Sequence, residues 1–366
     1  MFKFLLKSLY SVEQQSFGLD ISDRSVKFIQ LKKVKDGLDI TAFGSKDIPD
    51  GIISDGEIKN EDVLVDIIKD VLRNPKKGKL TTKNVIFSMP EEHSFLRVLQ
   101  LPNMNYSETA EAIKWETEQN IPLSVDEVYF DWQIIESSQN IKKDHQDIFI
   151  SAIPKVVADP YISVLKKIGL ISVAMEPESI SVVRSVVKDL RTNLPLLIID
   201  IGATTTSFVI FHGNVPVFSS SSKVAGRKMI DTLIKNLSID EKEALRLFYD
   251  VGFDRTIDGS DKVSEMLIPL FDNIIAQAEG YIEFYGSHSV GDDIAKKKNF
   301  EKIILSGGVA NLYGASGYIA TKLGIKTEIA NPWINILKSP LREIPDLSYS
   351  KSLGYTTALG LALRGV

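Results

Sequence analysis

The sequence predicts an α/β protein built from two related lobes, and three observations lead to this prediction. A strand, a tight polar turn and a second strand are expected over residues 194–211, where DIGATTT at 200–206 holds the turn. A similar unit is expected over residues 17–31, with its turn at 22–25. The length of 366 residues exceeds what one hydrophobic core usually supports. Two such hairpins predict two lobes, each offering one loop and one acidic residue to a cleft between them.

Both turns have the composition of a phosphate-binding loop. Small residues let backbone N–H groups converge on an anion, and Ser and Thr hydroxyls add donors. Asp20 and Asp200 end the strands before the turns, where each can hold Mg²⁺ through water. Lys27 follows Asp20 across the first hairpin, a spacing that can place its ammonium beside that carboxylate. The alternative for either hairpin by itself is an ordinary turn with an exposed Asp.

Composition narrows the class of protein. With 44% apolar and 25% charged residues, the chain can bury a sizeable core. A net charge of -5 argues against a dedicated nucleic-acid binder. The absence of cysteine excludes disulfides and thiolate chemistry, and the four histidines have no ligand spacing, so a zinc site is not expected. No apolar run reaches the length of a membrane-spanning helix. Residues 1–16 are expected to be a leader, either peripheral on a membrane or, in the alternative, packed on the protein or mobile.

The first lobe is expected over residues 17–89 and 171–194. Apolar alternation and turn residues predict strands at 17–21, 26–33, 38–43 and 84–89, with a turn at Asp36-Gly37. A helix is predicted from Asn60, which can cap it, to Leu72, because its apolar residues share one face. The linking segment 174–184 is predicted to be helical.

An inserted α+β unit is expected over residues 90–170. Its predicted elements are a strand at 95–101, a helix at 107–120, strands at 128–132 and 147–151, and a helix at 156–168. The polar stretch 136–146 is expected to be a solvated hairpin loop.

The second lobe is expected over residues 195–350. Helices are predicted at 227–237, 240–249 and 263–285, the last with a broad buried stripe. An apolar strand from 303 leads into Ser306-Gly307-Gly308, where glycine permits close approach of a flat or charged ligand. Gly226 and Arg227 open a helix that could flank an adenosine. A small-residue helix at 355–364 can pack closely on a neighbour, and residues 351–366 are expected to return to the interlobe hinge.

With these motifs in view, the chain resembles the actin/Hsp70/sugar-kinase superfamily and, within it, is similar to the FtsA-like PilM family of type IV pilus assembly. The resemblance implies an actin-like two-lobed fold with duplicated ribonuclease-H-like domains and an inserted small α+β subdomain of the FtsA type (1C, SHS2-like). The motifs that carry it are FGLDISDRSVK at 17–27, SMP at 88–90, LP at 101–102, AIKWE at 112–116, IP at 121–122, IDIGA at 199–203, LSGG at 305–308, NP at 331–332 and GLALR at 360–364.

The resemblance also implies ATP and Mg²⁺ between the lobes, with Asp20 and Asp200 organising the metal through water. Around the phosphates it implies Ser22, Asp23, Arg24, Ser25, Lys27, Gly202, Ala203, Thr204 and Thr205. Around the adenosine it implies Gly226, Arg227, Gly307 and Gly308. Glu176 matches the place of an acid that orients water in related ATPases, the alternative being an interlobe hydrogen-bonding acid. Three residues depart from the family pattern: Ser22 replaces a Gly, and Leu245 and Phe248 replace polar residues near the ribose.

In function, the resemblance implies a cytoplasmic scaffold, peripheral on the inner membrane, with at most weak ATPase activity. Its implied partners are the N-terminal peptide of a PilN-like membrane protein, bound in a groove beside the inserted unit, and other pilus platform proteins; self-association stays open. The alternatives are an FtsA-like filament or membrane tether, a small-molecule kinase of the same fold, and a scaffold that no longer binds nucleotide.

Overall fold

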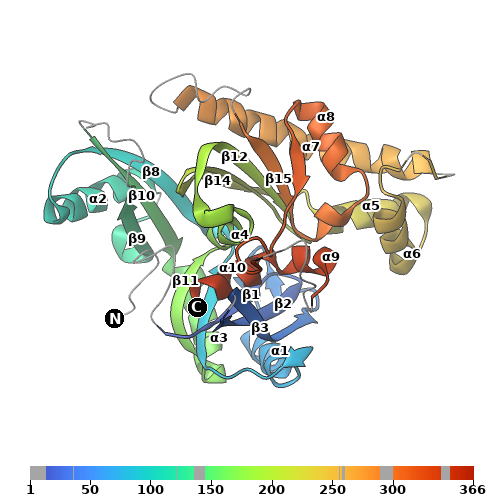
Figure 1. Cartoon of the computed structure of the whole chain (residues 1–366). Coiled ribbons are helices and arrows are strands. Elements are labelled where there is room, and N and C mark those ends of the chain that lie inside the picture. Colours follow the sequence, from blue (N-terminus) through green and yellow to red (C-terminus); the bar gives the residue numbers. More distant parts are fainter. Residues whose placement is uncertain are drawn as a thin grey trace.

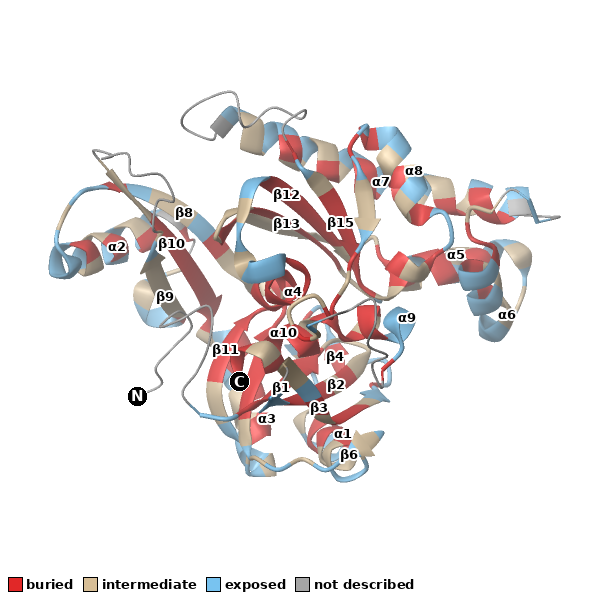
Figure 2. Cartoon of the chain, viewed as in Figure 1, coloured by how far each residue is buried: buried red, intermediate tan, exposed pale blue. Residues whose placement is uncertain are grey.

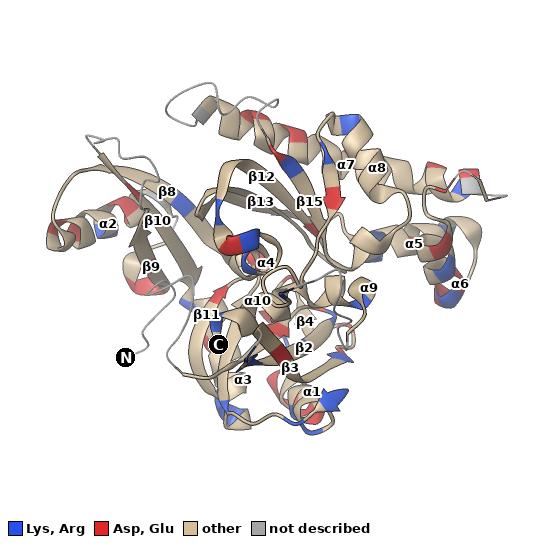
Figure 3. Ribbon diagram, viewed as in Figure 1, with Lys and Arg blue, Asp and Glu red and all other residues tan. Residues whose placement is uncertain are grey.

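The structure, a computed structural model, describes residues 14–35, 37–121, 123–135, 145–254, 256–257, 260–288, 300–338 and 347–366. Most of the expected leader, Asp36 of the expected turn and most of the expected loop at 136–146 lie outside these residues. Figure 1 shows two large sheets, one above the other, and a third, smaller sheet beside them. Figure 3 shows that the charged residues lie mostly on helices and loops, whereas the strands are largely uncharged.

The first large sheet has the strand order β11-β7-β1-β2-β3-β6. The pairs β1–β2, β2–β3 and β3–β6 are antiparallel. The pairs β1–β7 and β7–β11 are parallel. The strands are β1 (Phe17–Ile21), β2 (Ser25–Val34), β3 (Gly37–Asp47), β6 (Lys77–Gly78), β7 (Asn84–Met89) and β11 (Ile171–Pro177). Helix α1 (Glu61–Arg73) covers one face, and the Asn60 side chain accepts a hydrogen bond from the Val63 N–H as predicted. A short hairpin, β4 (Ile53–Ser54) and β5 (Glu57–Ile58), precedes this helix.

The second large sheet repeats this arrangement in the order β14-β13-β12-β15-β16. Its strands are β12 (Thr192–Ile201), β13 (Thr206–Gly213), β14 (Val215–Ser222), β15 (Lys302–Ser306) and β16 (Thr327–Ile329). As in the first sheet, three consecutive strands are antiparallel and two later strands lie parallel to the first of them. β12 begins three residues before the expected start of this lobe, because Thr192 already pairs with Gly213.

Three helices of the second lobe follow the predictions. They are α5 (Gly226–Leu237), α6 (Glu241–Arg246) with a π-helical turn at Leu247–Val251, and α7 (Ser260–His288). A fourth, α8 (Ala315–Leu323), was not predicted. The predicted stripe of α7 is buried in the core, notably Leu267, Phe271 and Ile274. Figure 2 shows the central strands of both large sheets buried, while α6 and α2 are largely exposed. Among the described residues, no helix combines the length and apolar character needed to cross a membrane.

The third sheet is the inserted unit, with the order β8-β10-β9. Its elements are β8 (Phe95–Pro102), α2 (Tyr106–Asn120), β9 (Val128–Ile134), β10 (His145–Pro154) and α3 (Lys155–Ile168). Although α3 was expected to complete this unit, its Tyr161 and Leu165 pack into the same core as Phe17 and Leu64. The core of the first lobe therefore continues into the inserted unit.

The segment that links the lobes differs from its prediction. Residues expected to form one helix from 174 instead end β11, which pairs with β7, and α4 (Glu178–Val186) begins only after Pro177. Proline suits the start of a helix because the N–H that it lacks would have no intrahelical acceptor at that position.

Each lobe ends in a helix that covers the other lobe. Val182 and Val186 of α4 pack in the core of the second sheet. The last helix, α10 (Thr356–Arg364), follows the short α9 (Tyr349–Ser352) and packs on the first sheet, where Ala358 belongs to the same hydrophobic cluster as Ile29. The two helices lie between the large sheets (Figure 1). They cross so closely that a Cβ on Gly360 would lie 1.7 Å from the Ser181 carbonyl oxygen, as a small-residue helix predicts.

Candidate functional site

A cleft of about 670 Å³ lies between the two large sheets. It is lined by both predicted turns, by the N-terminus of α5, by the glycine turn after β15 and by the start of α10. Every residue predicted to surround a nucleotide lines this cleft except Glu176. These residues are Asp20, Ser22, Asp23, Arg24, Ser25, Lys27, Asp200, Gly202, Ala203, Thr204, Thr205, Gly226, Arg227, Gly307 and Gly308.

The two turns share one hydrogen-bonding pattern. The Ser22 N–H donates to the Ser25 carbonyl at 3.0 Å, and the Gly202 N–H donates to the Thr205 carbonyl at 3.0 Å. Ser22 therefore forms the same turn as its glycine counterpart. The strands that follow are in the same register, since Asp20 pairs with Lys27 and Asp200 pairs with Ser207. The cleft is thus built from two copies of one local structure.

Asp20 is held by two partners on neighbouring strands. Its Oδ2 lies 3.8 Å from the Lys27 Nζ, and its Oδ1 accepts a hydrogen bond from the Ser88 hydroxyl at 3.1 Å. Burial raises the pKa of Asp20, while Lys27 and Ser88 act to lower it. The predicted ammonium beside this carboxylate is present.

Asp200 has fewer partners. Burial is the main cause that raises its pKa to about 6, and the charge of Asp20 also acts to raise it, whereas the neighbouring Ser306 hydroxyl and the charge of Lys27 act to lower it. Its Oδ1 is buried without a hydrogen-bond partner in the described part of the chain. An unpaired buried carboxylate oxygen is costly, so this atom is suited to a ligand that supplies positive charge.

Two glycines let the backbone close around the second turn. Gly307 has a φ of 84°, and a Cβ there would lie 2.3 Å from the Ile201 carbonyl oxygen. A Cβ on Gly226 would lie 2.8 Å from Val309, and the Gly226 N–H donates to the Gly202 carbonyl at 3.0 Å. A Cβ on Gly308, in contrast, would have only the Tyr249 hydroxyl nearby, at 4.0 Å. This part of the glycine turn therefore faces open space.

Three predicted site residues have charged side chains that bind other parts of the protein. The Asp23 carboxylate accepts the backbone N–H groups of Asp55 and Gly56, each at 3.0 Å. Arg24 pairs with Asp50, and Arg227 pairs with Asp231 at 3.0 Å. These side chains fix the shape of the cleft wall.

The position of Glu176 corrects the prediction that it orients water. Its side chain is fully buried, pairs with Arg184 and Arg364 and does not line the cleft. Burial alone would raise the pKa of Glu176, but the two guanidinium charges together lower it. Arg184 also donates to the Gly360 carbonyl at 2.9 Å. Glu176 is therefore the interlobe acid of the alternative, and it joins β11 to both crossing helices.

Glu178 lies in the cleft instead. Burial raises its pKa well above the usual range, and the charges of Asp20 and Glu92 raise it further. Glu178 lies only two residues after the predicted Glu176, in the same Glu-Pro-Glu segment. The sequence did not show that the strand ends at Pro177, and this end decides which of the two acids enters the cleft.

Exchanging each of these two acids for glutamine should separate their roles. Glu176→Gln leaves two buried guanidinium groups without their counter-charge, and we expect it to lower the free energy of unfolding by about 3 kcal/mol. Glu178→Gln removes a carboxylate that burial and its neighbours disfavour, so it should not destabilise the nucleotide-free protein. Urea unfolding at pH 7.5 compares the two variants, and equal destabilisation would contradict this assignment.

The two departures Leu245 and Phe248 line the cleft as expected, but sequence reasoning missed Ile230, Tyr249 and Thr356. Ile230, Tyr249 and the two departures Leu245 and Phe248 line one part of the cleft and are largely apolar. Thr356, from the last helix, also lines the cleft and accepts a hydrogen bond from the Ser306 hydroxyl at 3.1 Å. The missed residues lie on α5, on the π-helical turn and on α10, and no local motif joins these three segments.

Two sheets with the same strand order flank the cleft, and each lobe ends in a helix that packs on the other lobe. This architecture defines an actin-like protein. The same fold occurs in a PilM-PilN type IV pilus biogenesis complex, which has 22% identity, covers 96% of this chain and 98% of that chain, and gives a TM-score of 0.77. EutJ from Carboxydothermus hydrogenoformans has 14% identity, with 95% and 89% of the chains covered and a TM-score of 0.55. MreB 5 of Spiroplasma citri bound to AMPPNP has 16% identity, with 88% and 93% covered and a TM-score of 0.54.

The family described as type IV pilus assembly protein PilM matches residues 18–366. The chain therefore belongs to the PilM family, and the resemblance stated from its motifs is confirmed.

Proposed function

We propose that this protein binds ATP with Mg²⁺ between its lobes and serves as a scaffold of the type IV pilus assembly platform. The observation that carries the proposal is the pair of hairpins that bring Asp20 and Asp200 to one cleft, with a buried Asp200 oxygen left unpaired. MreB 5 of Spiroplasma citri, which has the same fold, binds the nucleotide AMPPNP, and this also supports the proposal.

The cleft fits the magnesium salt of a nucleotide. Among the residues that the structure describes, no three acidic or histidine side chains converge as direct metal ligands. Mg²⁺ usually keeps several waters and binds one or two carboxylates plus phosphates. Asp20 and Asp200 would hold the ion in this way, and its charge would offset the repulsion between them. Lys27 and the N–H groups of the two turns would receive the phosphates, and the apolar part of the cleft near Tyr249 would receive the base.

We assign any hydrolysis to Glu178, which would orient the attacking water. In the nucleotide-free protein, burial and neighbouring acids favour the neutral form of this carboxyl group. A neutral carboxyl group is a poor base, which is in line with at most weak ATPase activity.

The proposed partner is the N-terminal peptide of a PilN-like membrane protein, bound beside the inserted unit. Family membership supports this, as does the similarity to a structure of a PilM-PilN complex. β9 is one of the two edge strands of the inserted sheet, so one side of its backbone is not used within that sheet; the other edge strand, β8, contacts β14. Binding to such a peptide would make the protein peripheral on the cytoplasmic face of the inner membrane, beside other platform proteins. We propose the division into lobes at 17–89 with 171–194 and at 195–350, the inserted unit at 90–170 and the hinge helix at 351–366, with α3 packed in the core of the first lobe and β12 beginning at Thr192.

Calorimetric titration with Mg·ATP tests the nucleotide part. Lys27→Met should lower the affinity for ATP by about 10-fold, because a cation within reach of the phosphates is lost. Lys46→Met is the matched control, since Lys46 lies on the neighbouring strand and pairs with Asp70 outside the cleft. If neither wild type nor Lys46→Met binds ATP, the nucleotide role is wrong.

A labelled PilN N-terminal peptide tests the partner. We expect saturable binding to the folded protein by fluorescence anisotropy, with an affinity that changes when Mg·ATP is added. A scrambled peptide is the control. Equal binding of the two peptides would contradict the proposed partner.

A further inference from the structure

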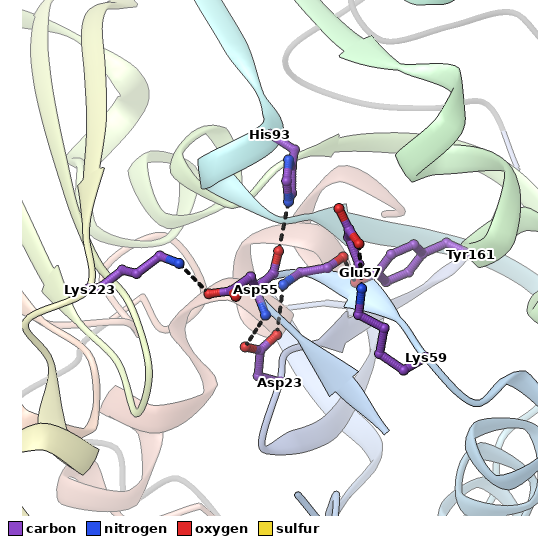
Figure 4. Close-up of polar contacts among 8 residues, drawn as sticks. Asp23, Asp55, Glu57, Lys59, His93, Tyr161 and Lys223 are labelled. Atoms are coloured by element: carbon purple, nitrogen blue, oxygen red, sulfur yellow. Dashed lines mark hydrogen bonds and ion pairs between the residues drawn. The ribbon is translucent and has the colours of Figure 1, made fainter. Parts of the chain in front are cut away.

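The turn between β4 and β5 joins parts of the chain that are far apart in sequence. Asp55 and Gly56 form it, with φ angles of 53° and 73°, as a tight two-residue hairpin turn requires. A Cβ on Gly56 would lie 2.7 Å from Pro90, so the turn packs closely beneath the start of the inserted unit. Figure 4 shows Asp23, His93, Tyr161 and Lys223 converging on this turn from separate elements.

The buried side of the turn is tied to the first phosphate loop and to the inserted unit. The Asp23 carboxylate accepts both backbone N–H groups of the turn. The Tyr161 hydroxyl, from α3, donates to the Gly56 carbonyl at 2.9 Å, and the Tyr161 side chain is only 1% exposed. The His93 Nε2 donates to the Asp55 carbonyl at 2.7 Å, because a carbonyl oxygen can only accept. Movement of the phosphate loop would therefore carry the turn and α3 with it.

The outer side of the turn reaches the second lobe. Lys223, directly after β14, pairs with the Asp55 carboxylate at 2.5 Å (Figure 4). The two side chains are 78% and 63% exposed, so the pair can break without exposing any buried group. The hydrogen bond and charge of Lys223 lower the pKa of Asp55, and both groups are charged at neutral pH. Exposed ion pairs contribute little, so this one can bias the separation of the lobes without locking it.

We propose that the Asp55–Gly56 turn is a nucleotide-linked latch, which couples the first phosphate loop to the closure of the second lobe and to the inserted unit. The nucleotide link rests on the proposed function. When a triphosphate orders the loop at 22–25, Asp23 holds the turn where Asp55 can pair with Lys223, and the closed state gains population. Tyr161 carries the same position to α3, beside the sheet of the proposed partner site.

The latch can be tested in the nucleotide-free protein by measuring distances between the two lobes. The chain has no cysteine, so spin labels can be attached to cysteines introduced at Asp62 on α1 and Lys242 on α6. Asp55→Asn and Lys223→Gln should each move the distance distribution toward longer values, and the double variant should move it no further than either single variant. Lys223→Arg keeps the charge and should match wild type. Lys59→Gln is the control, because Lys59 pairs with Glu57 within the same hairpin.

Titration with Mg·ATP tests the nucleotide link. Asp55→Asn and Lys223→Gln should each lower the affinity about two- to five-fold at low salt, and the difference should vanish near 1 M salt, where exposed charges are screened. If ATP binds but neither variant changes the distances or the affinity, the latch is wrong and the proposed function stands. If the distances change but neither wild type nor the variants bind ATP, the nucleotide role is wrong. The turn then couples the two lobes without a link to nucleotide.

Discussion

Replacing Asp200 by asparagine is expected to lower the affinity for Mg·ATP by about 100-fold, the upper range for a group that acts on a metal through its waters. The carboxylate and its unpaired Oδ1 supply negative charge to the centre of the cleft, and an amide of the same shape does not. Affinity of the wild-type protein should also fall as the pH is lowered through about 6, because a proton then competes with the cation at Asp200.

The same substitution is expected to stabilise the nucleotide-free protein. Burial raises the pKa of Asp200 from 3.8 to about 6, so ionisation costs the folded state free energy. For an acid whose pKa is higher in the folded than in the unfolded state, this cost is absent below the unfolded-state pKa. It grows between about pH 4 and 6 and is complete above pH 6. Because the side chain is partly open to the cleft, we expect Asp200→Asn to raise the free energy of unfolding by about 1–2 kcal/mol at pH 8. At pH 4 the two proteins should be equally stable.

Thermal melts at pH 4 and pH 8, with calorimetry at pH 8, check both effects. Asp272→Asn is the control of opposite sign, because a hydrogen bond from Tyr318 and the charge of Lys322 lower the pKa of that carboxylate. It should slightly destabilise the protein at pH 8 and leave ATP binding unchanged. If Asp200→Asn binds ATP as wild type does, then Asp200 does not organise a cation, whatever else the cleft holds.

Adding one methyl group at the helix crossing should have the largest effect on stability. In Gly360→Ala, the new Cβ would overlap the Ser181 carbonyl oxygen, at 1.7 Å. The obstacle is backbone, so relief requires α4 and α10 to separate, and that would disturb both lobes. We expect a loss of about 4 kcal/mol or more in the free energy of unfolding.

Gly280→Ala is the matched control. Gly280 also lies in a helix, α7, but a Cβ there would meet no atom of the described residues within 4 Å. The same exchange should stabilise the protein by about 1 kcal/mol, because alanine favours the helix. Urea unfolding of the two variants gives opposite signs if the crossing is as close as the structure has it. A tolerated Gly360→Ala would mean that the two helices are farther apart.

Several elements could be predicted from the sequence because their causes are local. The Asn60 cap and the apolar face of α1 lie within one segment, and the pairing of Asp20 with Lys27 follows from the length of one hairpin. The small residues of α10 predicted a close crossing, although not the partner at Ser181. The cleft residues near the phosphates were found for the same reason, since each set lies within one turn.

The remaining errors have a common physical origin. Glu176 and Glu178 are alike as local sequence, and only the pairing of β11 with β7 decides that the first acid is buried between Arg184 and Arg364. The end of that strand at Pro177 turns the second acid toward the cleft. Likewise, α3 shows an amphipathic pattern in sequence, but the pattern does not say that its apolar face joins the core of the first lobe.

By itself, the sequence determined the two hairpins, their acids, most of the helices and the family, because short-range hydrogen bonds and apolar spacing are written in consecutive residues. Only the tertiary structure decided which acid enters the cleft, which helix closes which lobe, and that Asp55 meets Lys223. Those outcomes depend on the packing of separate segments, in two cases 168 and 188 residues apart, and no local pattern encodes the partner.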